Sequence, residues 1–131
     1  GYHTDSRLIK LQHGRPDAVA DLHWEEKDGV LIARLVVSGP LSDADVDSMG
    51  QELLSAPERS AGKILLNFQD VEFIYSALLG KLVALRKQCK ENKTDLKLCS
   101  IRPVIMDVMK VARFDEIFEI YSSEQEAMAA F

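Results

Sequence analysis

The sequence predicts one α/β domain: a mixed sheet of four to five strands with about four helices packed against it. Short apolar runs rich in β-branched residues alternate with longer segments whose apolar residues recur every three or four positions. The order is two strands, then helix, strand, helix, strand, helix, strand, helix. Such alternation requires parallel strands joined by right-handed crossovers, and the opening pair adds an antiparallel hairpin.

The hairpin is expected from residue 21 to residue 37. Leu22 and Trp24 alternate with polar residues, Asp28-Gly29 is typical of a tight turn, and residues 30–37 are almost all apolar. The second strand is therefore predicted to be covered on both faces. Residues 1–20 are assigned to an N-terminal arm or an added strand, and residues 21–131 to the domain.

Two helices and a strand follow the hairpin. The first helix is expected to begin at Ser42 or Asp43 and to turn Val46, Met49, Leu53 and Leu54 inward. Residues 63–68 (KILLNF) predict a buried strand, and residues 76–90 give the strongest helical pattern. Its apolar stripe consists of Leu78, Leu82, Leu85 and Cys89, widened by Leu79 and Val83, and Asn92 ends the helix.

The C-terminal part repeats this alternation. Residues 95–100 alternate as a strand does, and Pro103 is placed to begin a third helix. We expect Leu82, Leu85, Ile105 and Val108 to be buried, with Met109 and Ala112 on the same face as Ile105. Residues 117–121 predict the last strand, and Ser123 with Glu126 forms the capping box of a short terminal helix.

Composition excludes several classes of function. A net charge of −5 argues against nucleic acid as a partner, because phosphate binding needs a basic surface. No apolar run is long enough to span a bilayer, and the N-terminus lacks a secretory signal, so we expect a cytoplasmic protein without membrane insertion. Cys89 and Cys99 are expected to be two small buried hydrophobes and not a disulfide.

One local stretch is basic. From Lys81 to Lys97 the sequence has six basic and two acidic residues, with Arg86, Lys87 and Lys90 on the polar side of one helix. Two interpretations stay open: an ordinary solvated helix face, or a docking patch for an acidic partner.

We expect no enzymatic activity, because no constellation of catalytic residues is visible. Neither phosphate-binding glycine motif occurs, and no G-x-S-x-G nucleophile turn is present. His3, His13 and His23 are spaced ten residues apart, which suits no single helical or strand face. Asp43, Asp45 and Asp47 lack the later ligands of a calcium loop. No metal and no cofactor are therefore predicted.

The segment from residue 65 onward resembles the STAS domain, the family of bacterial anti-sigma factor antagonists and of sulfate transporter tails. Family members place an apolar strand before a V-x-F/Y-x-D-S-[ST]-G-L-x-x-L signature, an amphipathic helix, a strand and a further helix. The corresponding segments here are residues 64–68, 71–80, 76–90, 96–99 and 114–118. With a weaker match through the hairpin, the resemblance covers about 110 residues and implies the STAS topology.

The signature of the family departs from its usual form at the residues that matter most for regulation. Tyr75 replaces the family's Asp, Ser76 matches the first hydroxyl position, Ala77 occupies the second, and Leu78 replaces the glycine. The second hydroxyl is the phosphate acceptor in sporulation-type antagonists, so the phosphorylation motif is degenerate here. Ser76 is the phosphoacceptor candidate, with a helix N-cap as the other interpretation.

The resemblance implies a protein–protein interaction module. The partner would be a serine kinase that acts as an anti-sigma factor, or a larger signalling assembly, in partner-switching regulation. A STAS regulatory subunit of a transport complex and a small-ligand-sensing STAS domain are alternatives. The resemblance places partner binding at Asp43, Asp45, Tyr75, Ser76, Ala77, Leu78, Leu79, Arg102 and Pro103. The oligomeric state is left open.

Overall fold

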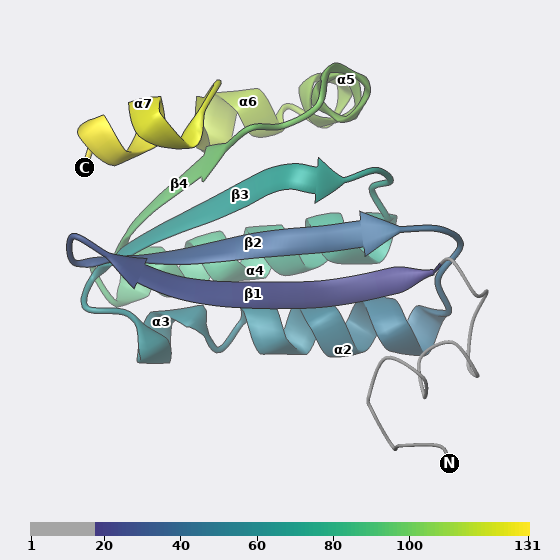
Figure 1. The fold of residues 1–131 in the computed structure, drawn as a ribbon, viewed down its shortest axis with the longest axis horizontal. Coiled ribbons are helices and arrows are strands. Elements are labelled where there is room, and N and C mark those ends of the chain that lie inside the picture. The colour runs from purple at the N-terminus through teal and green to yellow at the C-terminus, as the bar shows by residue number, and fades with distance from the viewer. Residues whose placement is uncertain (1–17) are drawn as a thin grey trace, which may run out of the picture.

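A computed structural model describes residues 18–131 and contains the predicted mixed sheet (Figure 1). Its five strands are β1 (Val19–Lys27), β2 (Val30–Ser38), β3 (Lys63–Val71), β4 (Asp95–Cys99) and β5 (Glu119–Tyr121), in that spatial order. β1 is antiparallel to β2, and the other neighbouring pairs are parallel. The sequence assigns residues 1–20 to an arm or an added strand. Of these, residues 1–17 lie outside the described residues, and β1 begins at Val19.

The described residues form four helices at the predicted places and two that the sequence did not predict. The helices are α2 (Asp43–Leu53), α3 (Ala56–Arg59), α4 (Ser76–Glu91), α5 (Pro103–Val111), α6 (Phe114–Ile117) and α7 (Glu124–Ala129). The unpredicted helices α3 and α6 have four residues each. No helix within residues 18–131 combines the length and apolar character needed to cross a membrane.

The hairpin turn explains how β1 and β2 pair. Asp28 and Gly29 both have positive φ, 52° and 78°, the combination that a two-residue hairpin turn of the primed type requires. The register therefore sets Lys27 opposite Val30 and Trp24 opposite Ala33. This register turns the apolar side chains of β1 towards the same core as the alternate residues of β2.

The main core lies between the sheet and the pair α2 and α4, which run side by side beneath it (Figure 1). Leu78, Leu82, Leu85 and Cys89 of α4 are buried at the predicted spacing. Each fully buried leucine contributes about 1.5 to 3 kcal/mol to folding. The stripe of α4 is thus the strongest single contribution of a helix to the core.

A smaller core lies on the other face of the sheet, beneath α7. It is formed by Val30, Ile32, Leu65, Cys99 and Ala127. The N-cap of α7 is Ser123, whose hydroxyl accepts a hydrogen bond from the Glu126 amide. The Glu126 carboxylate accepts a hydrogen bond from the Ser122 hydroxyl, so the predicted capping box forms only in half.

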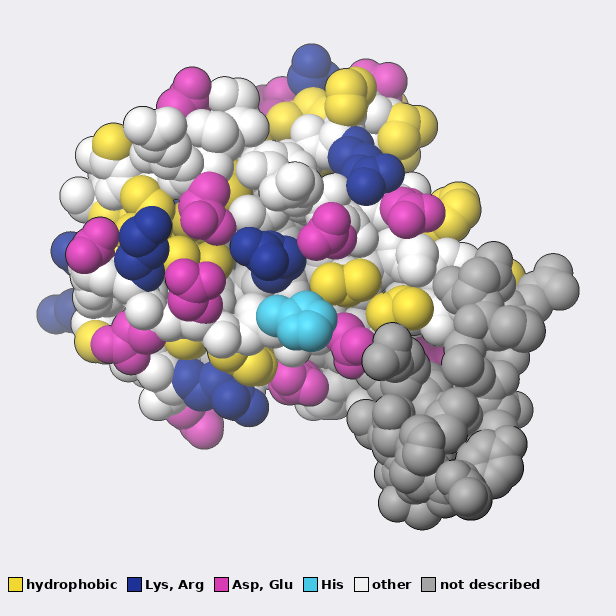
Figure 2. Space-filling model, viewed as in Figure 1, with side chains coloured by type: hydrophobic (Ala, Val, Ile, Leu, Met, Phe, Trp, Pro, Cys, Tyr) yellow, Lys and Arg dark blue, Asp and Glu magenta, His cyan; other side chains and the backbone are white. Residues whose placement is uncertain are grey.

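The rest of this second face is open to solvent over β1 and β2. Figure 2 shows acidic and basic side chains and a histidine on it. His23 and Arg34 stand opposite each other in the register and are both exposed. An open polar face of this kind is usual for an antiparallel pair.

Three expectations are wrong in detail. Val83 and Val108 are exposed, because α4 and α5 bury narrower stripes than the sequence suggested. On α5 the stripe reduces to Ile105 and Met109, four residues apart, so Ala112 is also exposed. Ile117 ends the short helix α6 instead of beginning a strand, since Arg113 in the left-handed conformation starts a new helical turn.

A buried lysine joins β4 to β5. The Lys97 ammonium lies 3.2 Å from the Asp95 carboxylate and 3.1 Å from the Glu119 carboxylate, and its side chain is only 4% exposed. The Phe131 ring centre lies 4.8 Å from the same nitrogen. Burial by itself lowers the pKa of Lys97, but the hydrogen bonds and charges of the two carboxylates outweigh it, so the pKa is raised above 10.5.

This raised pKa predicts a stability change at alkaline pH. Because the folded pKa of Lys97 exceeds the unfolded value, its stabilisation is complete below about pH 10.5 and is lost as pH rises through the folded pKa. The free energy of unfolding, measured with urea from pH 8 to pH 11.5, should fall more steeply in the wild type than in Lys97→Met. Parallel curves for the two proteins would contradict this assignment.

Candidate partner-binding site

The candidate residues gather at one edge of the sheet. β2, β3 and β4 are parallel, so their C-terminal ends lie at the same edge of the sheet; those of β2 and β3 are at the right of Figure 1, and the chain from β4 runs on to α5. The loops that leave these ends lead into α2, α4 and α5 respectively. We call the three loops together (residues 39–42, 72–75 and 100–102) the loop edge. In parallel sheets this edge is the usual place for binding sites.

Tyr75 connects two of the three loops. Its hydroxyl donates a hydrogen bond to the Gly39 carbonyl at 2.9 Å and accepts one from the Leu41 amide at 3.1 Å. Gly39 has a φ of 73°, a conformation that favours glycine, and this turn presents its carbonyl to the ring. The Tyr75 side chain is half-buried and therefore belongs in part to the scaffold of the domain itself.

Ser76 is the first residue of α4 and not its N-cap, so the alternative interpretation of Ser76 is wrong. Tyr75 holds the N-cap position with an extended backbone, and no side chain caps the helix there. The first amides of α4 thus lack a side-chain partner. The Ser76 side chain is exposed, and within the described part of the chain its hydroxyl has no hydrogen-bond partner.

The next three residues of α4 differ in exposure. Ala77 is exposed, Leu79 is half-buried, and Leu78 is only 1% exposed within the main core. Leu78 can therefore act on a partner only by holding the first turn of α4 in place.

The acids of α2 lie beside the same edge. Ser42 is the N-cap, and its hydroxyl accepts a hydrogen bond from the Asp45 amide at 3.2 Å. Asp43 and Asp45 stand in the first turn, where negative charge favours the helix dipole. Further along, Asp47 pairs with Lys81 of α4 at 3.4 Å and fixes the two helices to each other.

The third loop carries the basic side of the edge. Arg102 is exposed at the N-cap position of α5, and its Nε donates a hydrogen bond to the Gln69 carbonyl of β3 at 3.0 Å. Pro103 occupies the first turn of α5 and is also exposed. Ser100 has a φ of 61°, an uncommon conformation outside glycine that turns the chain sharply out of β4.

The structure adds one side chain that the sequence did not single out. Phe73, in the loop between β3 and α4, exposes 52% of its surface. It matches the F/Y position of the V-x-F/Y signature, which carried no expectation about burial. The backbone partners of Tyr75 carried no sequence signal either, since they are main-chain atoms more than thirty residues away.

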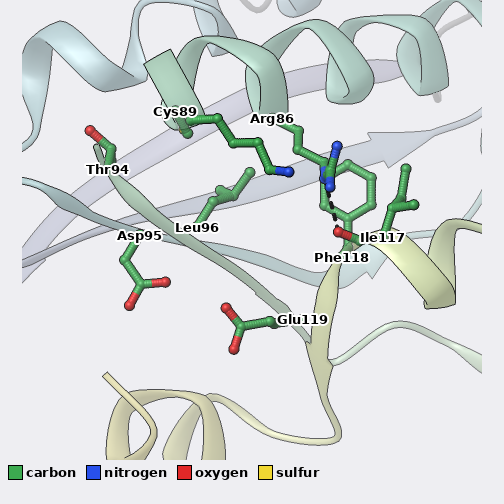
Figure 3. A pocket seen from close by; sticks show the side chains of 9 residues that line it. Arg86, Cys89, Thr94, Asp95, Leu96, Ile117, Phe118 and Glu119 are labelled. Carbon is green, nitrogen blue, oxygen red and sulfur yellow. Dashed lines mark hydrogen bonds between the residues drawn. The ribbon is translucent and has the colours of Figure 1, made fainter. Parts of the chain in front are cut away.

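A cavity of about 160 Å³ lies near the opposite end of α4 (Figure 3). Arg86, Cys89, Leu96 and Phe118 are among its lining residues, and Arg86 donates a hydrogen bond to the Ile117 carbonyl. Burial raises the pKa of Cys89 to about 11, so the thiol is protonated at neutral pH and is a poor nucleophile. Within residues 18–131 no cluster of His, Cys, Asp or Glu side chains could hold a metal ion.

Comparison with known proteins identifies the family. The model of the STAS domain matches residues 22–127. BtrV of Bordetella bronchiseptica, named as an anti-sigma factor antagonist, is 28% identical over 110 residues, which are 84% of this chain and 93% of BtrV. An anti-sigma F factor antagonist of Paenibacillus polymyxa is 25% identical over 108 residues, 82% of this chain and 91% of that protein.

The solved structures agree on the fold. The STAS domain protein from Planctomyces limnophilus, an anti-sigma factor antagonist by its description, superposes with a TM-score of 0.72 at 27% identity. The match covers 85% of this chain and 97% of that one. The α/β topology predicted from the sequence is therefore confirmed.

The Tyr75 contacts predict a measurable role in the loop edge. Tyr75→Phe removes the hydroxyl and leaves a partly buried carbonyl and amide without their partner, which should lower the free energy of unfolding by about 1 to 3 kcal/mol. Tyr121→Phe is the matched control, because its hydroxyl makes only a 3.4 Å contact with exposed Glu119. Equal urea midpoints for the two variants would show that the Tyr75 hydroxyl does not hold the loops.

Proposed function

Because this chain belongs to the STAS domain family, we propose that it is a non-catalytic anti-sigma factor antagonist that binds a serine kinase of the anti-sigma factor type. It would act in the cytoplasm of a bacterium as part of a partner-switching system. The observation that carries the proposal is the loop edge, where exposed residues of three loops surround the uncapped first turn of α4.

The loop edge suits a protein partner for a physical reason. Tyr75 and Arg102 each bond to backbone atoms of a neighbouring loop or strand, so the loops are held before a partner arrives. A preorganised surface loses little conformational entropy on binding. Asp43, Ser76, Ala77 and Pro103 are exposed around these contacts and are available to a partner.

The same geometry bears on regulation by phosphate. A phosphate on Ser76 would bring about −1.5 to −2 charges to the N-terminus of α4, whose free amides favour an anion. Ala77 has no hydroxyl, and the hydroxyl of Tyr75 is already bonded to the loop before α2. We therefore propose that the switch is degenerate: Ser76 is a weak phosphoacceptor, and partner binding persists in the presence of ATP.

Partner binding is tested with a serine-kinase anti-sigma factor from the same genome. Ala77→Glu places bulk and charge on the first turn of α4, next to the loop edge and at a helix position that tolerates an acid, and should weaken the complex about tenfold or more. Gln125→Glu makes a similar change in the first turn of α7, away from the site, and should leave affinity unchanged. Calorimetric titration measures both. Equal affinities of Ala77→Glu and the wild type would refute the site, and no complex with the wild type would refute the function.

Phosphorylation is tested with the same kinase, ATP and mass spectrometry. The wild type should carry little phosphate on Ser76, whereas Ala77→Ser should restore the acceptor position of the family and be phosphorylated at position 77 much faster. Ser76→Ala serves as the control for residual labelling. Stoichiometric phosphate on Ser76 of the wild type, with loss of the complex, would show that the switch is intact.

A further inference from the structure

The exposed apolar side chains of this protein gather on one side. Within residues 18–131, the large hydrophobic side chains that remain exposed are Phe73, Val83, Val104, Val108, Val111 and Ile117. All belong to the loop before α4, to α4 itself, or to α5 and α6. Figure 2 shows hydrophobic side chains gathered where Figure 1 places α5, with basic and acidic side chains among them.

Three of these residues form a stripe along α5. Val104, Val108 and Val111 are spaced by four and three residues, so they share one flank of the helix, beside the buried Ile105 and Met109. We call them the valine stripe; Val104 is 65% exposed and Val111 is 87% exposed. Valine is a weaker helix former than alanine, leucine or lysine, so helix propensity does not account for three valines on an exposed flank.

A flank of α4 borders the same side of the molecule. Lys81 of α4 faces α2 through its ion pair with Asp47, and Val83 lies about 200° further round the helix. Arg86, on the flank of Val83, donates a hydrogen bond to the Ile117 carbonyl of α6, which directly follows α5. Val83 and Ile117 therefore extend the apolar surface from α5 and α6 towards α4.

The charges around this apolar surface differ between its two parts. From Arg102 to Ile117, through α5 and α6, three cations (Arg102, Lys110 and Arg113) are balanced by three acids (Asp107, Asp115 and Glu116), and Arg113 lies 3.9 Å from Glu116. The polar side of α4 next to Val83 adds Arg86, Lys87 and Lys90. The excess of cations at this surface therefore comes from α4, in a chain whose net charge is −5.

We propose that the valine stripe is a docking site for an amphipathic helix of the partner protein, whose apolar face covers the valines and whose acidic residues meet Lys110 and the cations on the neighbouring flank of α4. Charge complementarity decides the occupant. A second copy of this chain would bring like charges together across a symmetric contact. An anionic membrane is the less suitable occupant, because the stripe lacks the Trp, Phe and Leu typical of membrane-surface helices.

The stripe extends the loop edge. Val104 directly follows Pro103, so one partner can contact both surfaces without a gap. This inference rests on the proposed function for the identity of the partner, while the chemistry of the docked helix rests on the stripe and the cations near it.

The first experiment uses the full chain and the serine-kinase anti-sigma factor. Val104→Glu/Val111→Glu should weaken the complex about tenfold or more, because it removes apolar contact and repels acids. Ser48→Glu/Gln51→Glu, on the exposed side of α2, is the matched control and should change affinity less than twofold. Hydrogen exchange should show protection of residues 103–111 in the complex. Unchanged affinity of the stripe variant would overturn the inference while leaving the proposed function in place.

The second experiment decides the inference even if that kinase does not bind. An acidic amphipathic helical peptide with a leucine face is titrated into the labelled chain, followed by NMR. The acidic peptide should shift the amide resonances of residues 103–111 of the chain. A counterpart peptide with lysines in place of the acids should shift these resonances far less. The inference fails if neither peptide shifts these resonances. It also fails if vesicles of equal parts phosphatidylserine and phosphatidylcholine bind through the stripe, or if sedimentation shows a dimer that the Val104→Glu/Val111→Glu variant no longer forms.

Discussion

Burial of β3 on both faces is the constraint on which the rest of the structure depends. Residues 64–68 are buried without interruption, with one set of side chains in the core beneath α2 and α4 and Leu65 in the core beneath α7. A strand covered on both faces needs neighbours on both edges, and here both neighbours are parallel to it. Parallel neighbours need crossover helices, and these crossovers bring the three loops to one edge. The position of the candidate site therefore follows from burying one apolar strand.

The chemistry of the loop edge follows from what stands at residue 75. An aspartate at this family position would add a charge beside the first turn of α4. Tyr75 instead reaches across to the Gly39 carbonyl and the Leu41 amide and orders the loop before α2 without a charge. The loop before α2 is thus held by hydrogen bonds of Tyr75 that do not involve Ser76, so they do not depend on a phosphate there. This would let the proposed partner surface stay formed whether or not a kinase is active.

Much of the fold could be predicted because local signals and burial agree. Asp28-Gly29, the stripe of α4 and Pro103 each mark an element where the structure has it. The errors on α4 and α5 have one origin: periodicity shows which flank is apolar but not how far a neighbour covers it, so Val83 and Val108 were expected inside. The contacts of Tyr75 could not be predicted, since its partners are backbone atoms of a distant loop. The valine stripe was also invisible, because only the packing of α5 through Ile105 and Met109 leaves those valines outside.

The surface formed by α5 and the neighbouring flank of α4 differs in charge from the rest of the molecule. The chain is negative as a whole, yet α5 and the nearby flank of α4 carry an excess of cations next to apolar side chains. At physiological ionic strength the screening length is about 8 Å, so this asymmetry acts only when a partner is already near. For the proposed partner the effect would be on orientation: its acids would be drawn to the cations of α4, and the apolar contact with α5 would hold it there. Since Pro103 joins α5 to the loop edge, the same orientation would bring the partner to Ser76 and Ala77.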